Sequence, residues 1–233
     1  MYETRKSSLW GKITILFVIC FFSLPAQAKY GGGSGTPEDP YLIYDASQMN
    51  AIGADSNEWH KHFKLMADIN LSSYTGTQFN IIGINWVNPF TGVFDGNDHT
   101  ISNFTYTSTI RYNIALFGYV GGENAEIKDL GLTAPDVNAG TGLYVGSLVG
   151  RLNNGILTNC YVEGGNVSGN RYIGELVGYS NGTITDCYSN GGVSGYASIG
   201  GLVGANYGII TYCSSTGSVL GSYSVGGLVV CNG

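Results

Sequence analysis

Short apolar segments recur at a regular interval in the second half of the chain, separated by Gly, Asn and Ser. One full unit, SIGGLVGANYGIITYCSSTGSVLGSY at 198–223, contains three apolar pieces: IGGLVG, GIITYC and GSVLG. Three columns recur at a nearly constant interval: Leu148, Leu176, Leu202 and Leu228; Cys160, Cys187 and Cys213; Val137, Val167, Val193 and Val219. Three short strands per unit predict one coil of a β-solenoid, stacked in parallel on the next coil about 4.8 Å away.

The repeat extends upstream of the glycine-rich units. The pattern ITDC at 184–187 consists of an apolar residue, any residue, Asn or Asp, and a second apolar residue. Copies stand at 101–104, 127–130 and 157–160, a weaker copy stands at 66–69, and 210–213 keeps the spacing without the amide or acid. Ile184 and Cys187 would face opposite sides of a straight strand, so we expect a bend at Asp186 that returns Cys187 to the interior.

These patterns predict an all-β fold, a right-handed parallel β-helix of 26–30-residue coils over residues 60–233, clearest from residue 144 onward. The 37 glycines and 17 tyrosines favour strands and tight turns over helices. Only VVCNG follows Leu228, so we expect the final coil to be truncated. We expect either that the chain is a fragment of a longer repeat protein or that its uncapped C-terminal coil associates end to end with a second copy.

Glycine-rich strings such as YVGSLVG, YIGELVG and SIGGLVG raise the alternative of a phosphate-binding loop. Such loops occur once, between a strand and a helix, whereas these glycines recur in every coil and no Lys follows them. We therefore interpret them as structural corners, with positive φ or no room for a Cβ atom two residues before each motif Leu. These corner positions are Gly146, Gly174, Gly200 and Gly226. Gly201, whose column also holds Ser147 and Glu175, is expected to tolerate substitution better.

The first residues have the features of an export signal. Residues 1–28 combine a basic start, an apolar run and an Ala-Gln-Ala ending, which predicts a signal peptide cleaved between Ala28 and Lys29. The apolar run is about a dozen residues long, too short for a bilayer that needs roughly 20, and no second apolar span follows. We expect a secreted or cell-surface protein without a transmembrane segment.

The segment between the signal and the repeats divides into two parts. Residues 29–40, KYGGGSGTPEDP, predict a flexible lead-in. Residues 41–59 predict a strand and a short helix that ends near Gly53, with a capping box formed by Asp45 and Gln48. This helix is expected to cover the open N-terminal end of the stack, where an exposed edge would otherwise pair with other chains.

Charge narrows the choice of partners. The chain has 16 Asp and Glu against 10 Lys and Arg, a formal net charge of −6. An acidic chain with scattered cations binds nucleic acid poorly. A cell-surface glycan or another protein is therefore the expected partner.

The motif GLVG at 201–204, with its variants ELVG at 175–178 and SLVG at 147–150, resembles the GLUG-motif proteins. The string NGTITDCYSNGGVSG is similar to the linker of that family, and EDPYLIYDASQMNAIG is similar to a leader that often precedes its repeats. The resemblance covers nearly all of residues 35–233. It implies an exported bacterial surface protein with a β-solenoid architecture. Such repeats also occur beside peptidase domains, but the chain has no His-Glu-x-x-His, so a peptidase activity does not carry over.

Four cysteines remain after signal cleavage: Cys160, Cys187, Cys213 and Cys231. An even number in an exported protein ordinarily suggests disulfides. However, the same column holds Phe104 and Leu130 in earlier coils, and stacked strands lie farther apart than the usual Cβ separation of about 3.5–4.5 Å in a disulfide. We expect buried free thiols in the column, with bridges as the alternative, and Cys231 in another register.

Three polar groups could bind a metal. The Asn/Asp column comprises Asp68, Asn103, Asp129, Asn159 and Asp186. It is expected to form an amide ladder, with cation binding as the alternative. The string FDGNDH at 94–99 begins like a calcium loop but lacks the later Glu, so we expect a turn. His60 and His62 could share a face and ligate zinc, but no third ligand is recognisable, so a structural role is expected.

No catalytic set is recognisable in the regular repeats. The acids Glu163, Glu175 and Asp186 fall in three different columns, and Arg151 and Arg171 are the basic residues there. A glycosidase needs two carboxylates about 5–10 Å apart across the sugar. We therefore assign no catalytic, cofactor-binding or metal-binding residue.

Function is expected to be that of an exported, non-catalytic, structural or adhesive surface repeat protein. The alternative is a carbohydrate-active β-helix enzyme or a sugar-binding module, in which exposed tyrosines stack on sugar rings. The candidate tyrosines are Tyr144, Tyr161, Tyr172, Tyr188, Tyr196 and Tyr207. A groove that brings together Asp95, Asp98 and Glu123 or Glu126 would favour the enzyme.

Overall fold

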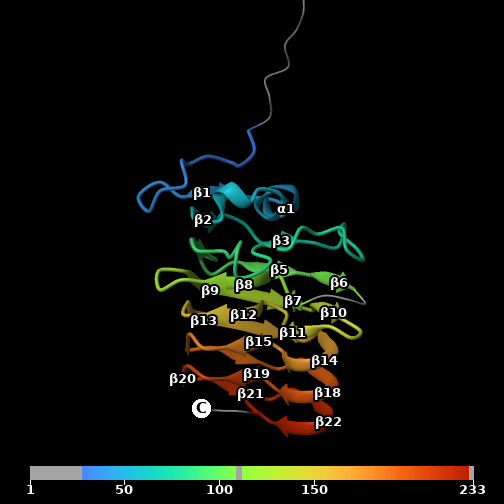
Figure 1. Cartoon of the computed structure of the whole chain (residues 1–233). Helices are drawn as coiled ribbons and strands as arrows, with labels where there is room; N and C mark the ends of the chain where they lie inside the picture. The colour runs from blue at the N-terminus through green and yellow to red at the C-terminus, as the bar shows by residue number, and fades with distance from the viewer. Residues whose placement is uncertain (1–27, 109–111, 231–233) are drawn as a thin grey trace, which may run out of the picture.

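A computed structural model describes residues 28–108 and 112–230 of the chain. The predicted signal peptide, apart from Ala28, and Cys231 lie outside the described residues. The described chain forms a single stack of parallel β-coils that runs from the N-terminal end at the top of Figure 1 to the C-terminal end at the bottom. The predicted parallel β-helix is therefore confirmed.

Three parallel sheets form the faces of the stack. The first contains β1 (Tyr41–Ile43), β2 (His62–Leu65), β3 (Ile69–Asn70), β4 (Val93–Asp95), β5 (Thr100–Ser102), β9 (Glu126–Thr133), β13 (Ile156–Glu163), β16 (Thr183–Thr185), β17 (Tyr188–Ser189), β20 (Ile209–Thr211) and β21 (Ser214–Ser215). The second contains β6 (Thr105–Thr107), β7 (Tyr112–Ile114), β10 (Asp136–Asn138), β11 (Leu143–Val145), β14 (Asn166–Gly174), β18 (Gly192–Gly200) and β22 (Val219–Gly226). The third contains β8 (Phe117–Gly121), β12 (Val149–Asn153), β15 (Val177–Ser180) and β19 (Val203–Asn206). Each regular coil contributes to all three sheets.

Strand register gives the relative length of each coil. Phe94 pairs with Ile127, Ile127 with Leu157, Leu157 with Ile184, and Ile184 with Ile210. From Phe94 onward the interval along the chain between paired positions decreases at every step, from 94–127 to 184–210, whereas the coil above, in which Phe63 pairs with Phe94, is shorter than the 94–127 coil. The coils below Phe94 thus shorten toward the C-terminus, and only those from Ile127 onward have the length that the sequence predicts.

The bend expected at Asp186 is present. Asp186 has φ +52°, and Asp129 and Asn159 occupy the same left-handed region at the same place in their coils. Because of this bend, Ile184 and Cys187 are both buried although they stand three residues apart. Asn and Asp adopt this conformation more readily than most residues, which accounts for the column.

Register corrects the alignment of the upstream copies. The position of Ile127 is taken in the preceding coil by Phe94, while Ile101 pairs with Leu132 on a later part of the strand. Phe104 therefore does not occupy the slot of Cys160, and neither Asp68 nor Asn103 belongs to the column of Asp129. Upstream coils are longer and contain an additional bend, so a four-residue pattern alone does not identify equivalent positions.

The corner glycines have a different role from the one expected. Gly146, Gly174, Gly200 and Gly226 do not have positive φ. A Cβ atom on any of them would instead overlap a backbone carbonyl oxygen three residues later, so the expectation of no room for a side chain is confirmed. Positive φ falls two residues earlier, at Tyr144, Tyr172, Ser198 and Ser224. A Cβ atom on Gly201 would also overlap a backbone oxygen, that of Gly227, which argues against the greater tolerance expected there.

The N-terminal end of the stack is covered. β1 pairs with β2, so the first coil begins before residue 60. The helix α1 (Ala46–Ala54) follows β1 at this end and is followed by the short 3-10 helix η1 (Ser56–Glu58). Asp45 accepts a hydrogen bond from the Gln48 amide at 2.9 Å, and the Gln48 side chain accepts one from the Tyr44 amide at 2.7 Å. These two bonds form the predicted capping box of Asp45 and Gln48, except that Gln48 accepts from the amide of Tyr44, one residue before the cap.

Residues 29–40, expected to be a flexible lead-in, fold back along β1. The Gly31 amide donates to the Leu42 carbonyl at 2.8 Å, and the Leu42 amide donates to the Gly32 carbonyl at 3.0 Å. Tyr30 is buried in the core beside Tyr41 and Phe63. The outer edge of the first strand is thus hydrogen-bonded to this segment, which removes an edge that could pair with another chain.

Candidate functional site

A groove of ≈ 680 Å³ lies on the described part of the stack. Its lining consists of Ile81, Ile84, Asn85, Trp86, Tyr112, Asn113, Tyr119, Tyr144 and Arg151. We call this the aromatic groove. Trp86 is 78% exposed and Tyr112 is 64% exposed, so large apolar surfaces face the solvent. Exposed aromatic surface gathered in a concavity is characteristic of a binding site.

A loop between β3 and β4 presents Trp86. The Asn85 side chain accepts hydrogen bonds from the amides of Val87 at 2.9 Å and Asn88 at 3.0 Å. The Ile84 amide donates to the Asn88 carbonyl at 3.0 Å and closes the turn. Local bonding of this kind is the reason Asn favours turns, and here it fixes the backbone on both sides of the indole.

Asn113 ties this loop to the solenoid. Its side-chain amide donates to the Ile84 carbonyl at 3.1 Å, and its backbone has φ +60° at the corner before Ile114. The residue is 8% exposed, and its Oδ1 atom has no hydrogen-bond partner. The buried side-chain amide of Asn113 therefore joins the loop around Trp86 to the corner before Ile114, and this contact forms one wall of the groove.

Arg151, on β12, forms the cationic part of the groove. Its guanidinium lies over the rings of Tyr179 at 4.7 Å, Tyr144 at 5.3 Å and Tyr119 at 5.7 Å. Contacts of a guanidinium with aromatic faces are attractive and hold the side chain in place. Among the described residues, no carboxylate forms an ion pair with it.

Tyrosines continue from the groove toward the C-terminal coils. Tyr144 and Tyr172 stack at 5.1 Å with an angle of 4° between their rings, and Tyr179 meets both edge-on. Tyr179 also contacts Tyr207 at 5.6 Å. Of the predicted candidates, Tyr144, Tyr172 and Tyr207 thus belong to one aromatic strip.

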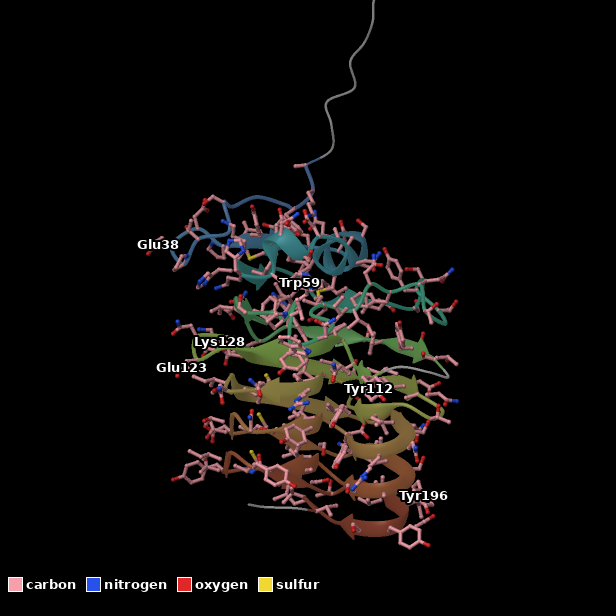
Figure 2. All side chains as sticks on the ribbon, in the orientation of Figure 1. Glu38, Trp59, Tyr112, Glu123, Lys128 and Tyr196 are labelled. Carbon is pink, nitrogen blue, oxygen red and sulfur yellow. The ribbon has the colours of Figure 1, made fainter. Side chains whose placement is uncertain are left out.

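The other predicted tyrosines lie apart from this strip. Tyr161 and Tyr188 stack on each other at 5.0 Å, and the Tyr188 hydroxyl donates to Glu163 at 2.8 Å. Tyr196 contacts Tyr223 near the C-terminal end of the stack, well below Tyr112 in Figure 2.

Three aromatic residues of the groove were not among the predicted candidates: Trp86, Tyr112 and Tyr119. The signal available in the sequence was the non-repetitive insertion INWVNP at 84–89, in which an Asn stands on either side of Trp86. Such an insertion interrupts the apolar pattern, so the search for repeated columns passed over it.

A second groove of ≈ 540 Å³ brings Glu123 and Glu126 together with His60 and His62. Figure 2 shows Glu123 and Lys128 on one side of the stack and Tyr112 on the other. Asp95 and Asp98, whose presence beside these glutamates would favour an enzyme, do not line this groove. Asp95 instead lies 3.7 Å from Lys64, which neutralises its charge.

Two of the remaining polar candidates form local hydrogen bonds. Asn159 donates a side-chain hydrogen bond to Asp129 at 2.8 Å, as expected of an amide ladder. In FDGNDH the Asp95 side chain accepts from the Asn97 amide at 2.8 Å, and Asn97 and Asp98 have positive φ, so this string forms the expected turn. Within residues 28–108 and 112–230, no group of three or more His, Cys, Asp or Glu could hold a metal ion.

The cysteine column contains free thiols. Cys160 and Cys187 are buried and Cys213 is partly buried. The Cys187 thiol donates to the Thr185 carbonyl at 3.1 Å. Hydrogen bonding between neighbouring thiols raises the pKa of Cys187 and of Cys213, which keeps both in the unreactive thiol form.

Glu175 is the exceptional carboxylate of the repeats. It stands at the first position of a motif that otherwise contains Gly or Ser, it is fully buried, and neither carboxylate oxygen has a hydrogen-bond partner. Burial raises the pKa of Glu175 to about 8. Because a substrate cannot reach a fully buried group, Glu175 is not a candidate catalytic acid.

Comparisons with known proteins agree with this architecture. The family model "The GLUG motif" matches residues 141–168 and 195–220. Over 159 residues, 65% of this chain, the sequence is 36% identical to a candidate Gly-rich membrane protein of Evansella cellulosilytica, and over 63% of the chain it is 35% identical to Halomucin of Haloquadratum walsbyi. The matched regions amount to 18% and 2% of these relatives.

A solved structure shares the fold. The crystal structure of a candidate immunoglobulin A1 protease from Bacteroides ovatus superposes with a TM-score of 0.73, over 88% of this chain and 65% of that one, at 24% identity. Within the part of the chain that the structure describes, no helix has the length and apolar character needed to cross a membrane.

Proposed function

The chain is a GLUG-motif repeat protein, and from this premise we propose that it is an exported adhesive repeat of the cell surface with no catalysis of its own. The family match and the relative that is named as a membrane protein support this proposal. The relatives are much longer than the region they share with this chain, so the chain corresponds to one part of each of them. An adhesive module needs a binding site rather than a catalytic set.

The observation that carries the proposal is the aromatic groove. Its volume, ≈ 680 Å³, lies within the usual range of about 300–1,000 Å³ for small-molecule sites. Its walls provide broad ring faces and amides but no carboxylate for acid–base chemistry. Sugars have one apolar face of C–H groups that packs on aromatic rings, and hydroxyls that pair with amides. We therefore propose a cell-surface glycan as the ligand.

Binding to immobilised glycans tests this proposal. We expect Trp86→Ala and Tyr112→Ala each to weaken binding by about tenfold or more, because each removes a large exposed ring. Tyr196→Ala is the matched control, since Tyr196 is similarly exposed but lies outside the groove. Unchanged binding in the groove variants, or an equal loss in the control, would contradict the assignment.

A second candidate function, a carbohydrate-active enzyme, is favoured by one observation. Glu123 and Glu126 share the second groove with His60 and His62. Two carboxylates across a sugar could act as general acid and nucleophile or base. Incubation with polysaccharides, followed by a reducing-end assay, distinguishes the functions. If the wild-type protein releases reducing ends and both Glu123→Gln and Glu126→Gln abolish this release, the chain is an enzyme and the adhesive proposal is wrong.

Export and self-association complete the proposal. Cleavage between Ala28 and Lys29 is tested by N-terminal sequencing of the secreted protein. The C-terminal coil exposes Leu220, Tyr223 and Val225, and among the described strands β22 pairs only with β18. We propose that this edge associates with a second copy, so Val219→Lys should lower the mass measured by light scattering at high concentration.

A further inference from the structure

We infer that the aromatic groove selects acidic sugars, and that Arg151 pairs with the carboxylate of the ligand. This inference rests on the proposed glycan-binding function and adds the chemical class of the glycan. Among the described residues that line the groove, only Arg151 is charged. The whole chain has a net charge of −6, so a cation without a described acidic neighbour in this groove is an exception to the general charge distribution.

The described part of the groove provides no counter-charge for this cation. No acidic residue is part of the lining, and the ion pairs of the described residues involve lysines and one histidine instead. The Nε atom of Arg151 is buried and has no hydrogen-bond acceptor among the described residues. A cation that is partly removed from water without a counter-charge favours the binding of an anion.

Three tyrosine rings hold the guanidinium ready for such a ligand. Tyr119, Tyr144 and Tyr179 surround it at 4.7–5.7 Å between guanidinium and ring centres. These contacts use the faces of the rings and leave the charge of the guanidinium intact. Because the side chain is already ordered by packing, a ligand loses less entropy when it binds than it would with a free arginine.

The ligand must therefore combine an apolar ring face with an anionic group. Trp86 and Tyr112 provide exposed aromatic faces, and Arg151 provides a planar set of N–H donors. A carboxylate attached to a sugar ring meets both requirements, and its planar geometry matches the guanidinium through two parallel hydrogen bonds. A sulfated sugar carries the same charge without the planar match, so we assign the carboxylate.

Calorimetric titration of the purified chain with oligosaccharides of matched length tests this assignment. The probes are oligogalacturonate, its methyl ester, a sulfated dextran oligomer and unmodified dextran oligomer. We expect the free acid to bind at least about tenfold more tightly than the ester, because a hydrogen bond to a charged group contributes that much. Arg151→Gln should abolish this difference, and Arg151→Lys should retain only part of it because lysine lacks the planar fork.

Arg171→Gln is the matched control. Arg171 lies 4.8 Å from the ring of Tyr172 in a similar cation–aromatic contact but does not line the groove. The preference for the free acid should persist in this variant. If Arg151→Gln does not fold, as judged by circular dichroism, the comparison of Arg151→Lys with wild type decides the question.

The outcomes separate this inference from the proposed function. If the acid and the ester bind equally well and Arg151→Gln does not change this, the acidic-sugar assignment is wrong. The glycan-binding proposal is not affected by that result. Tighter binding of the sulfated oligomer than of the free acid overturns the carboxylate assignment. Binding of none of the four probes, together with no binding on a broad glycan panel, contradicts both proposals.

Discussion

The upper coils, from β1 to β8, and the lower coils, from β11 to β22, use different side chains for the same architecture. The upper core contains six buried phenylalanines beside its aliphatic residues: Phe63, Phe79, Phe90, Phe94, Phe104 and Phe117. The lower core is aliphatic, with Leu, Ile, Val and Cys in columns, and its corners contain glycines where backbone approaches backbone. The coil from Phe94 to Ile127 is longer than the coils below it, and large rings such as Phe94 and Phe117 pack in this part of the core.

This contrast shows where variation is tolerated in the stack. In the lower coils the glycine corners are so tight that added atoms would overlap the backbone, so each coil copies its neighbour. In the upper coils the loop around Trp86 departs from the repeat and forms one wall of the aromatic groove, while regular strands supply Arg151 and Tyr144. The repeat is thus the scaffold, and the proposed site arises where an irregular coil meets a regular one.

The largest effect is expected in the aromatic half. Phe94→Ala should destabilise the protein by about 3–5 kcal/mol, since the ring is fully buried and packs on Phe117 at 5.2 Å. Urea unfolding measures this loss. The control is Leu157→Ala, two coils below in register, for which about 2–5 kcal/mol is expected. A distinctly smaller loss at Phe94 than at Leu157 would contradict the proposed difference, because it would mean that the upper core is the more loosely packed one.

The corners of the lower half provide the second test. Gly174→Val should destabilise by about 2–4 kcal/mol, because its side chain would overlap backbone atoms of two coils. Gly227→Val is the control, since nothing lies within 4 Å of the position of its Cβ atom. Similar unfolding midpoints for the two variants would show that the corners adapt and that tight backbone contact does not impose the regular repeat.

The buried carboxylate should make the lower half sensitive to pH. The pKa of Glu175 is raised to about 8 in the folded state, so the unfolded chain releases this proton at lower pH than the folded protein does. Stability should therefore fall as pH rises from about 4.5 to about 8, by on the order of a few kcal/mol, and level off above that. Glu175→Gln should remove this slope in urea titrations at pH 5, 7 and 9. A slope that persists in the variant would assign it to other groups.

The smallest effect is expected in the cysteine column. Cys187→Ala should cost about 1–3 kcal/mol through lost packing, since the thiol is buried between coils. Thiol titration of the denatured, unreduced protein should find at least three free thiols. If no free thiol is detected, the cysteines form disulfide bridges. Cys187→Ala would then lower the free energy of unfolding by more than the lost packing explains.

Local features of the chain were sufficient to predict much of this structure. The period of the lower coils, the bend at Asp186 and the capping box of Asp45 and Gln48 depend on residues close together in sequence, and all three are present. Columns of Leu, Val and Cys identified the interior because neighbouring coils repeat the same local geometry. The glycine corners were located correctly, although their cause proved to be backbone contact rather than positive φ.

Tertiary structure decided what depends on residues far apart. The apolar pattern predicted that Ile101 is equivalent to Ile127, but Phe94 is the residue that pairs with Ile127. The pairing between coils of unequal length depends on the whole stack and cannot be read from a local pattern. Trp86 and Arg151 line one groove although more than one coil separates them along the chain. The burial of Glu175 could not be predicted from the sequence either. Nothing in the neighbouring residues indicates whether a carboxylate at a glycine position points into the core. The coil therefore follows from local sequence, whereas the site follows from the stacking of unlike coils.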